Sequence, residues 1–359
     1  MKFISQFIKS FHLYKYFLIL ALLNVFFSTD KIEAKTFLIN DIEISTPFEI
    51  NFDKNQIIEE GFVQAFNQLM FKISKSNDHT KLNKTSLNKI KSMVETFSID
   101  EEKFINEIYY LKLNVSFNKK SIFNHLENLN IFPSIPLKKE LIFVPILIDQ
   151  TTNEIKIFSD NIFFNSWNLN KKNYNLLHYI LPSEDLEDYN LIRNNIGQIE
   201  NFNFYEIINK YNLNDYIIAI FFIENNQVKI LNKIYLDNEK KIKNLVLKNI
   251  NLNNQDEINK AIGKLKVIYE DHWKKQNEIN TSMKLELTIS IDNSNNIKIK
   301  KFEENLSKID LIYNFYIYKF DNKNNYYNIT FNGTPDKFLK TMKKNDYELE
   351  TKNKIWLIK

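Results

Sequence analysis

Apolar residues recur in this chain with two different periods, and this mixture limits the fold more than any other feature of the sequence. A period of two predicts half-buried strands, whereas spacings of three and four predict amphipathic helices. The period of two occurs in two distant segments: Tyr109, Leu111, Leu113, Val115 and Phe117, and then Met283, Leu285, Leu287, Ile289 and Ile291. Helical spacing runs from Ile58 to Ile73 and from Ile258 to His272. Because the two patterns are interspersed, the sequence predicts an α+β fold.

The order of these segments predicts three small α/β modules in series behind an N-terminal leader. The leader covers residues 1–34, and an N-terminal α+β domain is predicted over residues 35–136. An α/β domain is predicted over residues 139–276, and a ferredoxin-like domain over residues 282–359. The roughly 325 residues behind the leader are enough for two or three domains with full cores.

The N-terminal domain is predicted to contain an extended start, two helices, the alternating strand and a short third helix. Four apolar residues define the extended start: Phe37, Ile39, Ile42 and Ile44. A second helix is predicted from about Thr85, because four apolar residues have helical spacing: Leu87, Ile90, Val94 and Phe97. The third helix is predicted between Ile122 and Leu129.

The middle domain begins with a continuous apolar run from Leu141 to Ile148, which is short enough to be a buried strand. Pro145 lies inside this run, and proline predicts an edge position or a bulge. Turns at Asn225-Asn226 and Asp237-Asn238 then predict a three-stranded meander, followed by the long helix that ends near His272.

The C-terminal domain has the order strand, helix, strand, strand, helix, strand. A hairpin is predicted across Asn322 to Asn325, and the second helix begins at Pro335. This order is the split βαβ pattern of ferredoxin-like folds.

The first 34 residues have the pattern of an export signal. Lys2, Lys9 and Lys15 precede an apolar run from Tyr16 to Phe27, and Ala34 offers a cleavage point. The run is shorter than the roughly 20 residues that a spanning helix needs, which favours a cleaved signal peptide. We therefore expect a periplasmic protein, which would be tethered to the inner membrane only if the signal stayed uncleaved.

The segment from Leu181 to Asp188 has the most distinctive sequence in the chain, and it contains the candidate site residues Glu184, Asp185 and Asp188. Asp185 and Asp188, spaced by three, would share one face of a helical turn, close enough to share a cation or to shift each other's pKa. Alternatively, Ser183, Glu184 and Asp185 cap a helix N-terminus, where carboxylates face the positive end of the helix dipole. The sequence favours the cap, because two carboxylates rarely suffice to hold a catalytic metal.

Three stretches of the chain resemble the domain-of-unknown-function 2066 family of Gram-negative envelope proteins. Lys72-Ile73-Ser74 fits the ending of that family's alanine-rich helix, although most of the alanines are replaced here. The segment from Leu181 to Asp188 resembles the family's acidic signature. The sequence around Tyr211, Asp215 and Ile217 also resembles a segment of the family. The resemblance implies an exported protein of uncharacterised function. By fold analogy, the middle domain is similar to the α/β domain of TolB-like envelope assembly proteins.

The familiar catalytic templates fail on this sequence. It has no cysteine, no Gly-x-Ser-x-Gly elbow and no phosphate-binding glycine loop, and its formal net charge is only +4. We therefore predict no catalytic residue, no cofactor and no metal ligand, and no nucleic-acid partner.

The leading hypothesis from the sequence is a non-enzymatic periplasmic protein that acts in envelope assembly or maintenance by contacting an envelope protein of unknown identity. One alternative is a small-ligand or glycan-binding protein with its cleft beside Leu181 to Asp188, and it predicts a ligand-dependent rise in melting temperature. A further alternative is a divergent metal-dependent hydrolase, which predicts turnover that Asp185→Asn abolishes.

Overall fold

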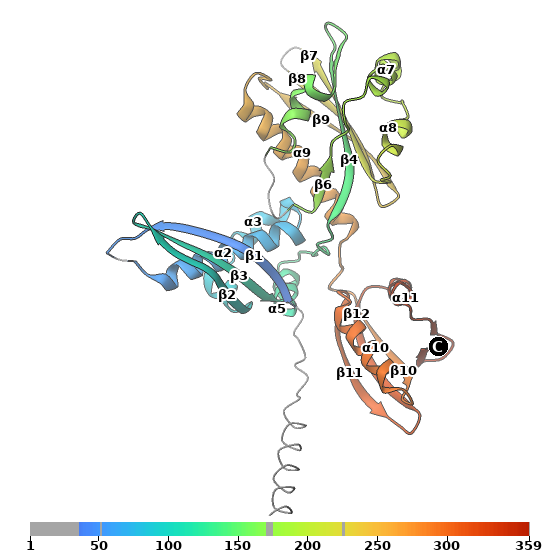
Figure 1. The fold of residues 1–359 in the computed structure, drawn as a ribbon. Helices are drawn as coiled ribbons and strands as arrows, with labels where there is room; N and C mark the ends of the chain where they lie inside the picture. Colours follow the sequence, from blue (N-terminus) through green and yellow to red (C-terminus); the bar gives the residue numbers. More distant parts are fainter. Residues whose placement is uncertain (1–35, 51, 170–174, 225–226, 359) are drawn as a thin grey trace, which may run out of the picture. The chain divides into compact units, whose positions relative to one another are not determined.

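A computed structural model describes residues 36–50, 52–169, 175–224 and 227–358 of the chain (Figure 1). The predicted signal peptide, residues 1–34, and the predicted turn at Asn225-Asn226 lie outside these ranges. Three separate sheets, with helices between their strands, give an α+β fold, as the sequence predicts. No helix in the described ranges has both the length and the apolar composition needed to cross a membrane.

The N-terminal sheet has three antiparallel strands in the order β1-β3-β2. Its strands are β1 (Thr36–Pro47), β2 (Val94–Ile105) and β3 (Ile108–Asn118). The register of β1 against β3 shifts between Ile39 and Ile42, where Asp41 has a positive φ of 59°. This bulge explains why the buried positions of β1 change from odd to even numbers along the strand.

Helix α2 (Lys54–Ile73) packs its apolar stripe against this sheet. Asp53 caps the helix by accepting a hydrogen bond from the backbone N–H of Asn55 at 2.8 Å. The helix approaches β3 closely at Gly61, since a Cβ built there would lie 2.4 Å from Cδ1 of Leu113. Glycine at this position therefore lets α2 pack this closely, and a larger residue would force the side chain of Leu113 to move.

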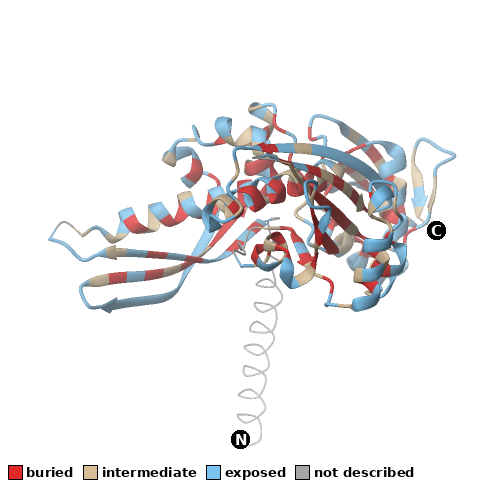
Figure 2. Ribbon diagram, turned by 90° about the horizontal axis from the view of Figure 1, so that it is seen from above, coloured by how far each residue is buried: buried red, intermediate tan, exposed pale blue. Residues whose placement is uncertain are grey.

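The predicted second helix is much shorter than expected, and the prediction was wrong beyond Lys91. The short helices of this region are α3 (His79–Leu82), α4 (Leu87–Lys91) and, after β3, α5 (Lys119–Asn128). Val94 and Phe97 belong instead to β2, which pairs with β3. Strand β2 is exposed along almost its whole length (Figure 2), so it lacks the alternation that would reveal a strand in the sequence.

The middle sheet has six strands, five of them in the order β5-β4-β7-β8-β9, with β6 also paired to β4. They are β4 (Lys139–Asp149), β5 (Glu154–Lys156), β6 (Leu177–Ile180), β7 (Tyr216–Glu224), β8 (Gln227–Leu236) and β9 (Glu239–Lys248). One face packs on α6 (Ile162–Ser166) and α9 (Gln255–Gln276). The other packs on α7 (Leu186–Asn194) and α8 (Tyr205–Asn209).

Pro145 lies in β4, which keeps an unbroken register with β7 on one side, so no bulge forms there. On its other side the strand is locally an edge at Pro145, which is one of the two predicted alternatives. On the opposite side of β4, β6 pairs only up to Ile142 and β5 only from Leu147. Pro145 lies between these two pairings, where its missing N–H breaks no strand-to-strand bond. Its carbonyl accepts a hydrogen bond from Nδ2 of Asn161 at 3.1 Å.

The C-terminal sheet has five strands in the order β11-β12-β10-β14-β13. Its elements are β10 (Lys284–Asp292), α10 (Asn296–Lys308), β11 (Ile312–Phe320), β12 (Asn324–Asn332), α11 (Pro335–Lys344), β13 (Leu349–Glu350) and β14 (Trp356–Ile358). The ferredoxin-like prediction is not confirmed. Strand β14 runs parallel to β10, and the additional strand β13 pairs with its outer side, whereas the split βαβ pattern has a single closing strand.

Replacing Gly61 with alanine is expected to lower the free energy of unfolding by about 1–3 kcal/mol, because the added methyl group overpacks against buried Leu113. Gly263→Ala in α9 is the matched control, since beyond the neighbouring backbone of its own helix no atom lies within 4 Å of the added Cβ. It is expected to stabilise the protein by about 0.5–1 kcal/mol. Urea denaturation of the full chain measures both changes, and an equal stabilisation by both variants would contradict the close approach of α2 to β3.

Candidate functional site

Asp185 is the N-cap residue of α7, as the cap interpretation of the sequence predicts. Its Oδ1 accepts a hydrogen bond from the backbone N–H of Glu187 at 2.8 Å. Glu187 and Asp188 follow in the first helical turn, where carboxylates are stabilised by the helix dipole. The local sequence therefore accounts for where α7 begins.

Lys210, just beyond the end of α8, joins the two aspartates. Its Nζ lies 2.6 Å from Oδ2 of Asp185 and 2.7 Å from Oδ1 of Asp188. Hydrogen bonding to Lys210 lowers the pKa of Asp185, and the two carboxylates raise the pKa of Lys210. The side chain of Asp188 is almost fully buried, whereas those of Asp185 and Lys210 are about one-third exposed.

A second bond ties the same two segments together. The phenol oxygen of Tyr211 accepts a hydrogen bond from the backbone N–H of Ser183 at 2.7 Å. Lys210 and Tyr211 are adjacent in the sequence, so one turn of chain after α8 holds the whole start of α7. We call the group formed by Asp185, Asp188 and Lys210 the acidic clamp.

The structure brings together Asp185 and Asp188 but gives Glu184 a different contact. Oε1 of Glu184 accepts a hydrogen bond from the backbone N–H of Ser159 at 3.2 Å, in the short 3₁₀ helix η2 (Phe158–Asp160) after β5. The position between the two aspartates, where a shared cation would lie, is occupied by the ammonium of Lys210. Across the described ranges, no cluster of three or more His, Cys, Asp or Glu side chains could hold a metal ion.

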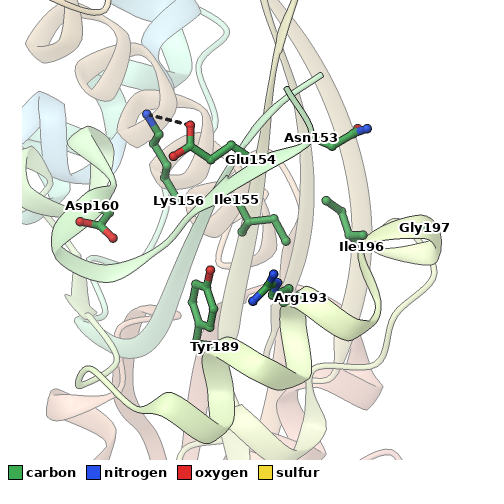
Figure 3. A pocket seen from close by; sticks show the side chains of 9 residues that line it. All are labelled: Asn153, Glu154, Ile155, Lys156, Asp160, Tyr189, Arg193, Ile196 and Gly197. Carbon is green, nitrogen blue, oxygen red and sulfur yellow. Dashed lines mark ion pairs between the residues drawn. The ribbon is translucent and has the colours of Figure 1, made fainter. Parts of the chain in front are cut away.

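A cavity of about 880 Å³ lies beside the same helix, and the sequence reasoning missed it (Figure 3). It is lined by the end of the β4–β5 turn, by β5 and the 3₁₀ helix that follows it, and by one side of α7 with the residues after it: Asn153, Glu154, Ile155, Lys156, Asp160, Tyr189, Arg193, Ile196 and Gly197. None of Glu184, Asp185 and Asp188 is among them. One signal was available, because Arg193 is the only arginine in a chain rich in lysine.

Tyr189 and Arg193 are four residues apart, so both project from one side of α7 toward β5 (Figure 3). On the strand, Nζ of Lys156 lies 3.4 Å from Oε2 of Glu154. Arg193 forms no ion pair with any carboxylate in the described ranges. The cavity thus holds one partnered cation and one guanidinium that is available to a ligand.

Comparison with known proteins adds little to this geometry. No family model matches the chain, and no curated protein matches it. A solved structure described as "Crystal structure of uncharacterized protein" is 12% identical, covering 40% of this chain and 95% of its own, with a TM-score of 0.17. A likeness this weak carries no argument, and the resemblance to the domain-of-unknown-function 2066 family stays a prediction.

Replacing Lys210 with methionine is expected to lower the free energy of unfolding by about 1–3 kcal/mol, because buried Asp188 would lose its cation. Lys229→Met is the matched control: Lys229 pairs with Glu224 at 2.5 Å, and both side chains are about half exposed. Exposed pairs contribute less than about 1 kcal/mol. Chemical denaturation at neutral pH distinguishes the two, and similar losses in both variants would show that the clamp is an ordinary surface pair.

The acidic clamp should also affect stability at low pH. The pKa of Asp185 is lowered in the folded state, chiefly by Lys210 and then by the N–H of Glu187. Its contribution to stability is therefore present above the unfolded pKa of about 4 and is lost as the pH falls through the folded pKa. Comparing unfolding at about pH 5 and about pH 2, we expect a smaller acid loss in Lys210→Met than in the unmodified protein. An unchanged acid loss would contradict this role of Lys210.

Proposed function

We propose that this chain is an exported, non-enzymatic interaction protein of the bacterial envelope, which binds an extended segment of a partner protein on an open sheet edge. The export signal and the lack of a catalytic template in the sequence support the proposal. The acidic clamp supports it as well, because Lys210 engages the carboxylates that a hydrolase would need free.

The observation that carries the proposal is the outer edge of β9. This strand ends the middle sheet, so one row of its backbone N–H and C=O groups is unpaired with any strand of the described chain. Ile242 is 68% exposed and Val246 is 46% exposed. An exposed edge strand with apolar side chains is a template for strand addition by another chain.

The charge of β9 indicates which partner it suits. The strand carries four lysines against the single acid Glu239: Lys240, Lys241, Lys243 and Lys248. Lysines on an edge oppose pairing with a second copy of the same strand, because like charges would face each other. They favour an acidic extended segment, which would gain both the backbone bonds and charge complementarity.

The test is site-specific photo-crosslinking in cells of the tagged full-length protein, with the crosslinking amino acid at Ile242. The matched control position is Ile297, which is 82% exposed but lies in α10 and not on a sheet edge. We expect one reproducible envelope protein to be captured from Ile242 and not from Ile297. Substituting Lys241 and Lys243 with glutamate should reduce that capture several-fold, because the charge complementarity is reversed.

Capture of the same proteins from both positions, or of none from Ile242, would contradict the proposal. Mass spectrometry of the purified chain gives its mature N-terminus in the same experiment. A chain beginning near Lys35 would support export with cleavage, and a chain retaining Met1 would point to a membrane-tethered protein.

A further inference from the structure

The cavity beside α7 lies between an edge strand and a helix. Strand β5 is the last strand on its side of the middle sheet. Its three residues, Glu154 to Lys156, pair with Asp149, Ile148 and Leu147 of β4. No strand of the described chain lies beyond β5. Its outer edge is therefore open to an added strand, and α7 faces that space across the cavity (Figure 3).

Arg193 gives this space a specific binding group. Its guanidinium presents a planar fork of N–H donors that fits a carboxylate with two parallel hydrogen bonds. The side chain is exposed, points toward β5 and has no carboxylate partner within the ranges that the structure describes (Figure 3). A ligand carboxylate would meet no competing acid already bound to Arg193.

The remaining charges of the cavity limit the ligand to a single negative group. Glu154 is already paired with Lys156, and Asp160 adds another carboxylate to the lining. Because Lys156 is paired with Glu154 and Asp160 lines the same space as Arg193, the cavity has no excess positive charge to attract a polyanion such as a phosphorylated or multiply acidic ligand. Asp160 suits instead an N–H donor, such as a backbone amide of the ligand.

The size and lining of the cavity suit a short stretch of chain. Its volume of about 880 Å³ lies within the range of small-ligand sites, about 300–1,000 Å³. Ile155 and Ile196 provide apolar contacts, and Tyr189 provides a ring with a polar tip. One tyrosine is a poor platform for a sugar chain, whereas an open strand edge beside a guanidinium fits an extended peptide end.

We infer that this cavity binds the carboxyl-terminal end of an extended peptide. The peptide backbone pairs with the outer edge of β5, and its terminal carboxylate binds the guanidinium of Arg193. The site is separate from the β9 edge, so the inference does not depend on the function proposed above.

The test uses the immobilised full chain and two pools of random heptapeptides, one with free carboxyl termini and one amidated. Bound peptides are identified by mass spectrometry. We expect peptides with a free carboxyl terminus to be enriched at least about tenfold over their amidated counterparts, because a charged hydrogen-bonded pair contributes about 1.5–3 kcal/mol.

Arg193→Gln should reduce this enrichment to background, and Arg193→Lys should retain only part of it, since lysine lacks the bidentate fork. Lys344→Gln, which removes one exposed positive charge in the last turn of α11, is the matched control and should bind as the unmodified chain does. Because Arg193 is exposed, its variants should keep the melting temperature of the parent protein, so loss of binding would not reflect unfolding.

Equal enrichment of the two pools would overturn the role assigned to the carboxylate. Enrichment of neither pool would overturn peptide binding altogether. Unchanged binding by the Arg193→Gln variant would show that Arg193 does not bind the peptide carboxylate. None of these outcomes affects capture from Ile242, so failure of this inference and of the proposed function can be told apart.

Discussion

The burial of β4 and β7 on both faces is the constraint on which the middle sheet and its candidate sites depend. The two strands are parallel, and their register is unbroken from the pair of Ile142 with Tyr216 to the pair of Asp149 with Ile223. Phe143 stacks on Trp167 with 3.7 Å between ring centroids on one face, whereas Val144 belongs to the core on the other face. Each large side chain buried in this way contributes about 1.5–3 kcal/mol. Helices must therefore cover both faces, and the core under α7 and α8 places Lys210 against the acidic residues.

Buried polar groups inside this core are occupied with structural hydrogen bonds. Oε1 of Glu270 accepts from the backbone N–H groups of Leu176 and Leu177, at 3.0 and 2.9 Å, and thereby fixes the start of β6. Burial raises the pKa of Glu270. The hydroxyl of Tyr269 donates to the side chain of Asn232. A buried carboxylate with a raised pKa can indicate catalysis, but these contacts explain Glu270 as an anchor for a strand that has few pairing partners of its own.

Much of the fold could be predicted because burial leaves a period in the sequence. The alternation from Tyr109 to Phe117 became β3, with all five apolar side chains buried, and the helical stripes became α2 and α9. Strand β2 could not be predicted, because a strand exposed on nearly every residue has no period to detect. The direction of β14 could not be predicted either. It is decided by two residue pairs between β10 and β14 and by a short return through β13, and neither feature has a sequence signal of its own.

The candidate site shows the same division between local and distant information. The cap formed by Asp185 lies within three residues of its partner, so the spacing alone predicts it. The clamp does not follow from spacing, since Lys210 lies 22 residues beyond Asp188 and reaches it only because α7 and α8 share one core. Two aspartates spaced by three therefore have no fixed chemical meaning in a sequence. Whether they hold a metal or a lysine is decided by the element that folds against them, and in this chain that element supplies an ammonium group.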